Sequence, residues 1–156
     1  MIQVRVGPEP IEIEALFERL EVAGAGGIAT FTGRVRGDDG VDLLELEHYP
    51  GVTERALTGL AEEAAARWSL AATLIVHRVG PMRPGERIVF VGIAASHRGA
   101  ALDACAFLID RLKTDAPFWK REARGSEARW VEARAADDAA AARWRTGSAA
   151  SGREPG

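Results

Sequence analysis

Two lysines stand out in a sequence that otherwise uses arginine for its positive charges. Of the 20 Lys and Arg residues, only Lys113 and Lys120 are lysines. A lysine amine that is desolvated or crowded by other cations can lose its proton and act as a base or nucleophile, whereas arginine keeps its charge. The structural alternatives are a cation at a helix end for Lys113 and a solvent-facing strand charge for Lys120. We interpret both as candidate catalytic residues that need an amine.

Two further cationic clusters could bind an anion. Arg34 and Arg36 lie two residues apart, so on a strand they share one face. His97 and Arg98 follow Ser96 at the expected start of a helix, where free amides and a partial positive charge attract anions. Solvated strand charges and ordinary capping by Ser96 are the structural alternatives. The two clusters predict a site for a phosphate or another oxyanion.

The remaining reactive side chains are expected to be structural. His77 lies in an apolar strand, and Cys105 lies on the apolar face of a helix, where free cysteine is usually buried. The 3 histidines are scattered singly and the one cysteine has no partner for an intrachain disulfide. We therefore expect no bound metal, and we assign no cofactor.

Composition excludes several classes of protein. The chain has 156 residues, of which 47% are hydrophobic and 28% charged, as is typical of one folded domain rather than a disordered chain. A formal net charge of −3 disfavours a general nucleic-acid binder. Without a long apolar run or a signal-like first segment, we expect no membrane association and a cytoplasmic location.

Hydrophobic periodicity and turn residues predict an α+β fold. We expect one domain over 1–145 and a disordered Gly/Ser/Ala-rich tail over 146–156. Strands 28–36 and 43–49 would form a hairpin, and 73–79 and 87–95 would pair antiparallel. Further strands are expected at 2–6, 118–122 and 129–133, and helices from Pro10 to the glycines at 24–27, at 54–68, from Ser96 to about Lys113, and at 137–144. The buried stripe of the third helix would consist of Leu102, Cys105, Leu108, Ile109 and Leu112.

The length of this third helix has a consequence for the site. The 15 residues from Arg98 to Lys113 span roughly 22 Å at about 1.5 Å per residue, too far for both ends to reach one small ligand. A two-fold dimer would place the helix start of one protomer beside the helix end of the other. We therefore predict a homodimer with composite sites.

Six motifs occur in order along the chain: TFTGRVR at 30–36, LEHYPG at 46–51, SHR at 96–98, LKT at 112–114, APFWKRE at 116–122 and RWVEA at 129–133. Together they closely resemble the large, catalytic subunit of molybdopterin synthase. The resemblance extends from about 27 to 144, and a set of this size is far more specific than any one motif.

The resemblance implies an α/β-hammerhead fold with antiparallel strand pairs and packed helices. It also implies a sulfurtransferase of molybdenum cofactor biosynthesis, in which a homodimer binds two copies of a small ubiquitin-like sulfur-carrier subunit as a heterotetramer. The carrier's C-terminal glycine thiocarboxylate would donate sulfur to cyclic pyranopterin monophosphate. Two such transfers would build the dithiolene of molybdopterin.

By position, the resemblance implies catalytic roles for Lys113 and Lys120. The substrate-binding residues would be Phe31, Arg34, Val35, Arg36, His97, Arg98, Arg121 and Glu122. Arg34 stands where relatives hold lysine, and the turn at 37–41 is short. The alternatives from other classes are a non-catalytic module that grips the C-terminus of a ubiquitin-like partner and an anion-dependent nucleic-acid module.

Overall fold

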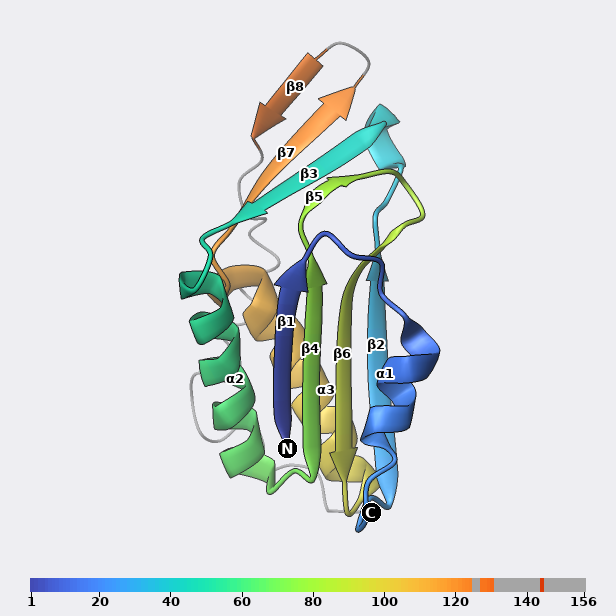
Figure 1. Cartoon of the computed structure of the whole chain (residues 1–156), viewed down its shortest axis with the longest axis vertical. Helices are drawn as coiled ribbons and strands as arrows, with labels where there is room; N and C mark the ends of the chain where they lie inside the picture. The colour runs from blue at the N-terminus through green and yellow to red at the C-terminus, as the bar shows by residue number, and fades with distance from the viewer. Residues whose placement is uncertain (125–126, 131–143, 145–156) are drawn as a thin grey trace.

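Two four-stranded sheets form the framework of the computed structural model, which describes residues 1–124, 127–130 and 144 (Figure 1). The first sheet has the order β1 (Ile2–Gly7), β4 (Ala72–Arg78), β6 (Arg87–Ala95), β2 (Gly27–Arg34). Its β1 and β4 strands are parallel, and the other pairs are antiparallel. The second sheet is antiparallel, in the order β5 (Gly80–Met82), β3 (Leu43–His48), β7 (Phe118–Arg124), β8 (Glu127–Trp130).

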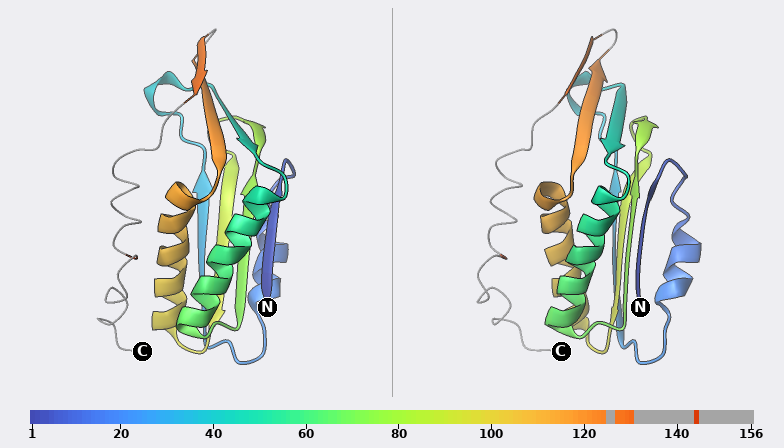
Figure 2. Two further views of the ribbon diagram at one scale, coloured as in Figure 1. Left: turned by 90° about the vertical axis from the view of Figure 1, so that its left-hand side faces the viewer. Right: turned by 60° about the vertical axis from the view of Figure 1, so that its left-hand side comes forward.

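Helices cover both faces of the first sheet (Figure 2). Helix α1 (Ile13–Leu20) lies on one face, and α2 (Val52–Trp68) and α3 (Arg98–Asp115) lie on the other. Strand β6 is buried on both sides: Phe90 packs in the cluster with α1, whereas Val91 and Ile93 pack in the cluster with α2 and α3. This sandwich fixes the sheet as a rigid base for the residues at its edge.

The second sheet extends beyond the end of α3, at the opposite end of the molecule from the start of that helix (Figure 1). A smaller core cluster joins the two sheets and consists of Val35, Leu44, Leu46, Val79 and Met82. A short 3₁₀ helix, η1 (Asp38–Gly40), lies in the connection from β2 to β3. The space between the sheets and the end of α3 is where the candidate site lies.

The α+β prediction and the antiparallel pairing of 73–79 with 87–95 are confirmed. The predicted hairpin of 28–36 with 43–49 is wrong, because β2 pairs with β6 and β3 pairs with β7 in the other sheet. The ladder shifts register between Gly33 and Arg34, and Val35 N–H then donates to Glu86 O as the chain leaves the first sheet. Helix 137–144, apart from Trp144, and the tail 146–156 lie outside the described residues.

Helix boundaries also differ from expectation. Helix α1 starts at Ile13 rather than Pro10, and α3 starts at Arg98 with His97, not Ser96, as its N-cap. Helical spacing predicts Leu102 in the buried stripe of α3, but its side chain is 54% exposed. Within the described part of the chain, no helix is long and apolar enough to cross a membrane.

Close backbone packing sets the position of the α3 start. A Cβ added at Gly26 would lie 2.1 Å from Ser96 O, and one at Gly27 would lie 3.1 Å from Arg98 Cα. We expect Gly26→Ala to destabilise the fold by about 1–3 kcal/mol, because the Ser96 backbone must move. Urea unfolding measures this loss.

A matched control is Gly59→Ala in helix α2. No heavy atom lies within 4 Å of a Cβ built at Gly59, so this change is expected to be neutral or to stabilise by up to about 1 kcal/mol through helix propensity. Equal effects of the two substitutions on the free energy of unfolding would contradict the close-packing explanation.

Candidate functional site

A pocket of about 850 Å³ lies between the two sheets and the C-terminal end of α3. Strands β2, β3, β4, β6 and β7, helix α3, and the connection after β2 all contribute to its walls. Of the residues proposed from sequence, those that line it are Phe31, Arg34, Val35, Arg36, Lys113, Lys120 and Glu122. Both lysines of the chain are therefore at one cavity.

The two arginines after β2 form one wall of the pocket. Arg34 is held by its Nε, which donates to Gly85 O at 3.0 Å. Arg36 Nε lies 3.9 Å from the Asp38 carboxylate in an exposed ion pair. Val35 between them is buried and joins the core cluster between the sheets. Because Val35 anchors this segment, both guanidinium groups stay at the cavity.

Strand alternation places a second set of charges on the pocket from β7. Lys120, Glu122 and Arg124 share the face that lines the cavity. The Glu122 carboxylate lies 3.2 Å from Arg124 and 3.9 Å from Lys120 Nζ, and its side chain is only 13% exposed. A carboxylate shared by two cations holds this row of side chains in place at the pocket wall.

Lys113 reaches the same cavity from the last turn of α3. Leu112 beside it is buried in the core, and it lines the pocket together with Ile109 and Ala116. Helix α3 ends at Asp115, and the following chain turns at once into β7. The direct passage from helix to strand explains how residues seven positions apart, Lys113 and Lys120, line one pocket.

His97 and Arg98 are not among the residues that line this pocket. They lie at the start of α3, whereas the α3 residues that line the pocket, Ile109, Leu112 and Lys113, belong to its C-terminal half. His97 is the N-cap, with no side-chain hydrogen bond to the helix and no acidic residue in the first turn. The structural alternative, capping by Ser96, is therefore not what the structure shows, and the helix start keeps the features that attract an anion.

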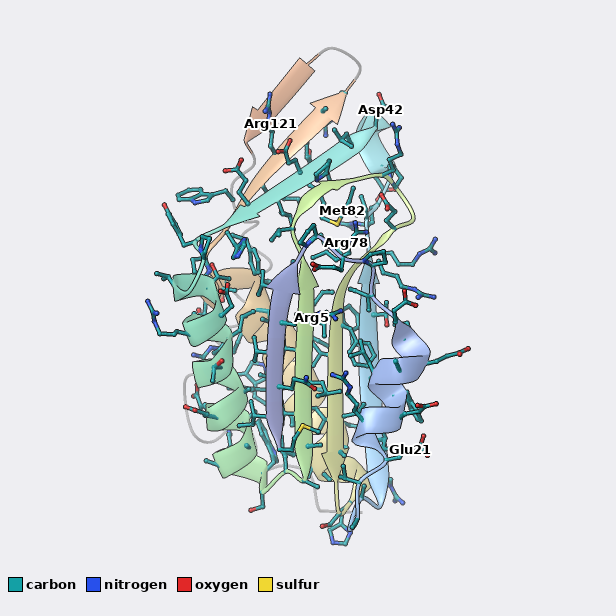
Figure 3. All side chains as sticks on the ribbon, viewed as in Figure 1. Arg5, Glu21, Asp42, Arg78, Met82 and Arg121 are labelled. Atoms are coloured by element: carbon teal, nitrogen blue, oxygen red, sulfur yellow. The ribbon has the colours of Figure 1, made fainter. Side chains whose placement is uncertain are left out.

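Arg121 also lies away from the pocket, on β7 in the second sheet (Figure 3). Its exposed side chain shares the outer face of β7 with Trp119, which is 50% exposed and packs edge-on against Tyr49 at 5.8 Å. The role that the family resemblance gives Arg121 stays a prediction.

Sequence reasoning missed several polar pocket residues, among them Arg124 and His77. Arg124 continues the alternation of Lys120 and Glu122, so a longer expected strand would have identified it. His77 is structural by its sequence pattern, yet it lines the cavity from the end of β4. Burial lowers the pKa of His77 to about 4, so its imidazole is neutral at physiological pH.

Cys105 does not line the pocket, and its side chain lies on the buried face of α3 in the main core cluster. Burial raises the pKa of its thiol to about 11, whereas an exposed cysteine ionises near pH 8.5. Ionisation therefore favours the unfolded chain, and the stability contributed by the neutral thiol is present below about pH 8.5 and lost as the pH rises toward 11.

We expect Cys105 of the native protein to react with iodoacetamide at pH 8 at least about 100-fold more slowly than in urea-unfolded protein. Mass spectrometry over a time course measures the two rates. Labelling of the native protein as fast as the unfolded chain would show that the thiol is accessible and ionisable.

Among residues 1–124, 127–130 and 144, no group of three or more His, Cys, Asp or Glu residues is arranged to hold a metal ion. The polar groups of the pocket are amines, guanidinium groups, two carboxylates and one imidazole, with the hydroxyl of Thr32 beside them. Such a set can bind an anionic substrate and transfer protons or an acyl-linked group.

Comparisons with known proteins identify relatives of this chain. Residues 6–115 match the family model described as MoaE protein. The chain is 47% identical over 146 residues to the molybdopterin synthase catalytic subunit of Escherichia coli (strain K12), covering 91% of this chain and 97% of that protein. A solved structure of the molybdopterin biosynthesis MoaE protein from Burkholderia ambifaria MC40-6 superposes with a TM-score of 0.82 at 45% identity, over 94% of this chain and 99% of that one.

A more distant structure shares the fold. It is the protein–protein complex of subunits 1 and 2 of molybdopterin-converting factor from Helicobacter pylori 26695. The TM-score is 0.72 at 18% identity, over 85% of this chain and 91% of that chain.

Proposed function

The chain belongs to the MoaE family of molybdopterin synthase catalytic subunits, and from this premise we propose how its pocket carries out the reaction. As a member it is a sulfurtransferase of molybdenum cofactor biosynthesis. We infer that the sulfur donor is the C-terminal thiocarboxylate of a small ubiquitin-like carrier and that the acceptor is cyclic pyranopterin monophosphate.

The observation that carries the proposal is the meeting of Lys113, Lys120, Arg34 and Arg36 at one cavity of about 850 Å³. Two negatively charged reactants, a thiocarboxylate and a cyclic phosphate, must be brought together there. Four cations at one cavity offset their mutual repulsion. The apolar floor made by residues such as Val89 and Leu112 offers a surface for a flat ring.

Three of the four cations, Arg36, Lys120 and Lys113, have a specific role in the proposal. Arg36, with His97 and Arg98 of a second protomer, binds the substrate phosphate. Lys120, held near Glu122, steers the thiocarboxylate and stabilises the negative charge that develops during transfer. Lys113 acts at the reacting centre, either by moving a proton or by attacking the carrier's acyl carbon transiently. Phe31 and Val35 shape the wall, and Glu122 orients Lys120.

Each transfer replaces a carbon–oxygen bond on the side chain of the pterin with a carbon–sulfur bond, and it replaces the acyl carbon–sulfur bond of the carrier with a carbon–oxygen bond. The oxygen that replaces sulfur leaves on the carrier as a carboxylate. No net oxidation or reduction is needed, so the step balances with carrier, pterin and water alone. Two carriers are consumed for one dithiolene.

The proposed assembly is a homodimer that binds two carrier subunits. The Helicobacter pylori structure is a complex of two different subunits of molybdopterin-converting factor, which supports a small-subunit partner for this chain. Within this proposal, the protein acts in the cytoplasm.

The test is incubation of the protein with thiocarboxylated carrier and cyclic pyranopterin monophosphate, followed by mass detection of a product with two sulfur atoms. We expect stoichiometric conversion of two carriers to the carboxylate form per product. Carrier binding without sulfur transfer would instead favour a non-catalytic binding module. Sulfur transfer at an undiminished rate with Lys113→Ala would remove the pocket from the mechanism.

A further inference from the structure

His77 occupies a position in the pocket that the proposed mechanism does not use. It is the next-to-last residue of β4 and lies opposite Val89 of β6 in the sheet register. Its ring stacks on Phe118 of β7, with ring centroids 4.1 Å apart and an angle of 25° between the planes. All three side chains line the cavity. The imidazole therefore lies at the junction of the two sheets, with its plane close to parallel with the Phe118 ring.

The hydrogen bonding of this ring fixes its tautomer. Nδ1 lies 2.8 Å from the Arg78 carbonyl oxygen. A carbonyl oxygen only accepts, so Nδ1 carries the hydrogen and donates. Because burial keeps the ring neutral down to about pH 4, Nε2 retains its lone pair and is a hydrogen-bond acceptor.

A neutral acceptor is unusual among the other polar side chains of the pocket. Arg34, Arg36, Lys113, Lys120 and Arg124 are donors only. The carboxylates, Asp38 and Glu122, are held in ion pairs with some of these cations. Of the pocket side chains in the described part of the chain, the uncharged acceptors are His77 and the hydroxyl of Thr32.

The apolar lining of the pocket that contains His77 suits a flat ring. Phe31, Phe118, Val89, Val91, Ile109 and Leu112 supply aromatic and aliphatic surface. A ligand with a phosphate and a nitrogen heterocycle would place its phosphate at the cationic rim and its ring on this floor. A pterin ring carries N–H groups that lose hydrogen bonds to water on burial, and each needs an acceptor inside the pocket.

We propose that His77 is a specificity-determining residue for the pterin, with its Nε2 accepting a hydrogen bond from an N–H group of the substrate ring. This inference rests on the proposed function for the identity of the ligand. It concerns recognition of the pterin ring, whereas the proposed function concerns the transfer of sulfur.

Three variants separate an acceptor role from a packing role. His77→Gln places an amide near the position of Nε2, His77→Asn places one near Nδ1, and His77→Phe keeps the stacking on Phe118 without any polar atom. We expect cyclic pyranopterin monophosphate to bind at least about tenfold more weakly to His77→Phe and His77→Asn, and His77→Gln to recover part of the loss. Carrier binding should stay within about twofold of the parent protein in all three.

Two readouts complete the experiment. In the ¹⁵N spectrum of histidine-labelled protein, the unprotonated Nε2 resonance of His77 should shift upfield when the pterin binds and not when the carrier binds. With saturating pterin, His77→Phe should still form the two-sulfur product, with a raised KM and little change in kcat. Equal pterin affinity of the Asn and Gln variants, or an Nε2 resonance that does not respond to pterin, would overturn the inference. Absence of product from the parent protein would instead overturn the proposed function.

Discussion

Lys113→Arg is expected to abolish formation of the dithiolene, with a loss of about 100-fold or more in the rate of sulfur transfer. The substitution keeps the positive charge at the end of α3, so binding of the anionic reactants and the favourable interaction with the helix dipole should survive. What is lost is an amine that can give up a proton or form a bond to carbon, because a guanidinium group stays protonated. Single-turnover formation of the two-sulfur product measures the loss.

Lys120→Arg is the matched variant, since Lys120 lines the same cavity and is paired with Glu122. Its proposed role is electrostatic and arginine retains the charge, so an amine is needed less strictly at Lys120 than the rarity of lysine in the sequence indicates. We therefore expect a smaller loss than with Lys113→Arg, and carrier affinity within about threefold of the parent protein for both. A larger loss with Lys120→Arg than with Lys113→Arg would mean that Lys120 supplies the essential amine and Lys113 the electrostatic stabilisation. Undiminished turnover with Lys113→Arg would exclude an essential amine at that position.

Much of the fold follows from local pattern. The strand 73–79 and its antiparallel partner 87–95 were predictable because both are apolar and a turn of prolines and glycines joins them. The partner strand of β2 was not predictable, because hydrophobic periodicity identifies a strand but not the strand that pairs with it in the sheet. The glycine turn at 37–40 looked like a hairpin loop, but it carries the chain from one sheet to the other.

The site was predictable to a similar extent. The rarity of lysine pointed to Lys113 and Lys120, and the structure brings both to one pocket. His77 gave no such signal, because one polar residue in an apolar strand resembles a satisfied core histidine. Its place in the cavity depends on the second sheet, whose Phe118 is 41 residues further along the chain. Contacts of this range are set by tertiary packing, which no local window contains.

Subunit complementation is the second large effect that we expect. Arg98→Ala and Lys113→Ala should each be nearly inactive as homodimers. When equal amounts of the two variants are unfolded and refolded together, half of the dimers would be mixed. Each mixed dimer would contain one intact site out of two. The mixture should therefore regain about a quarter of the activity of the parent protein. The reason is the length of α3, which separates Arg98 from Lys113 by roughly 22 Å within one chain.

The control pairs two residues of one pocket. Lys113 and Lys120 line the same cavity of one chain, so every mixed dimer of Lys113→Ala with Lys120→Ala has a defect in each site. This pair should regain no activity, although subunits exchange equally well, which differently tagged chains and native mass spectrometry verify. If activity recovers when Lys113→Ala is mixed with Arg98→Ala, but not when it is mixed with Lys120→Ala, each site takes its helix start from the neighbouring protomer. If neither mixture recovers although mixed dimers are present, Arg98 acts on the pocket of its own chain, and the composite site is wrong.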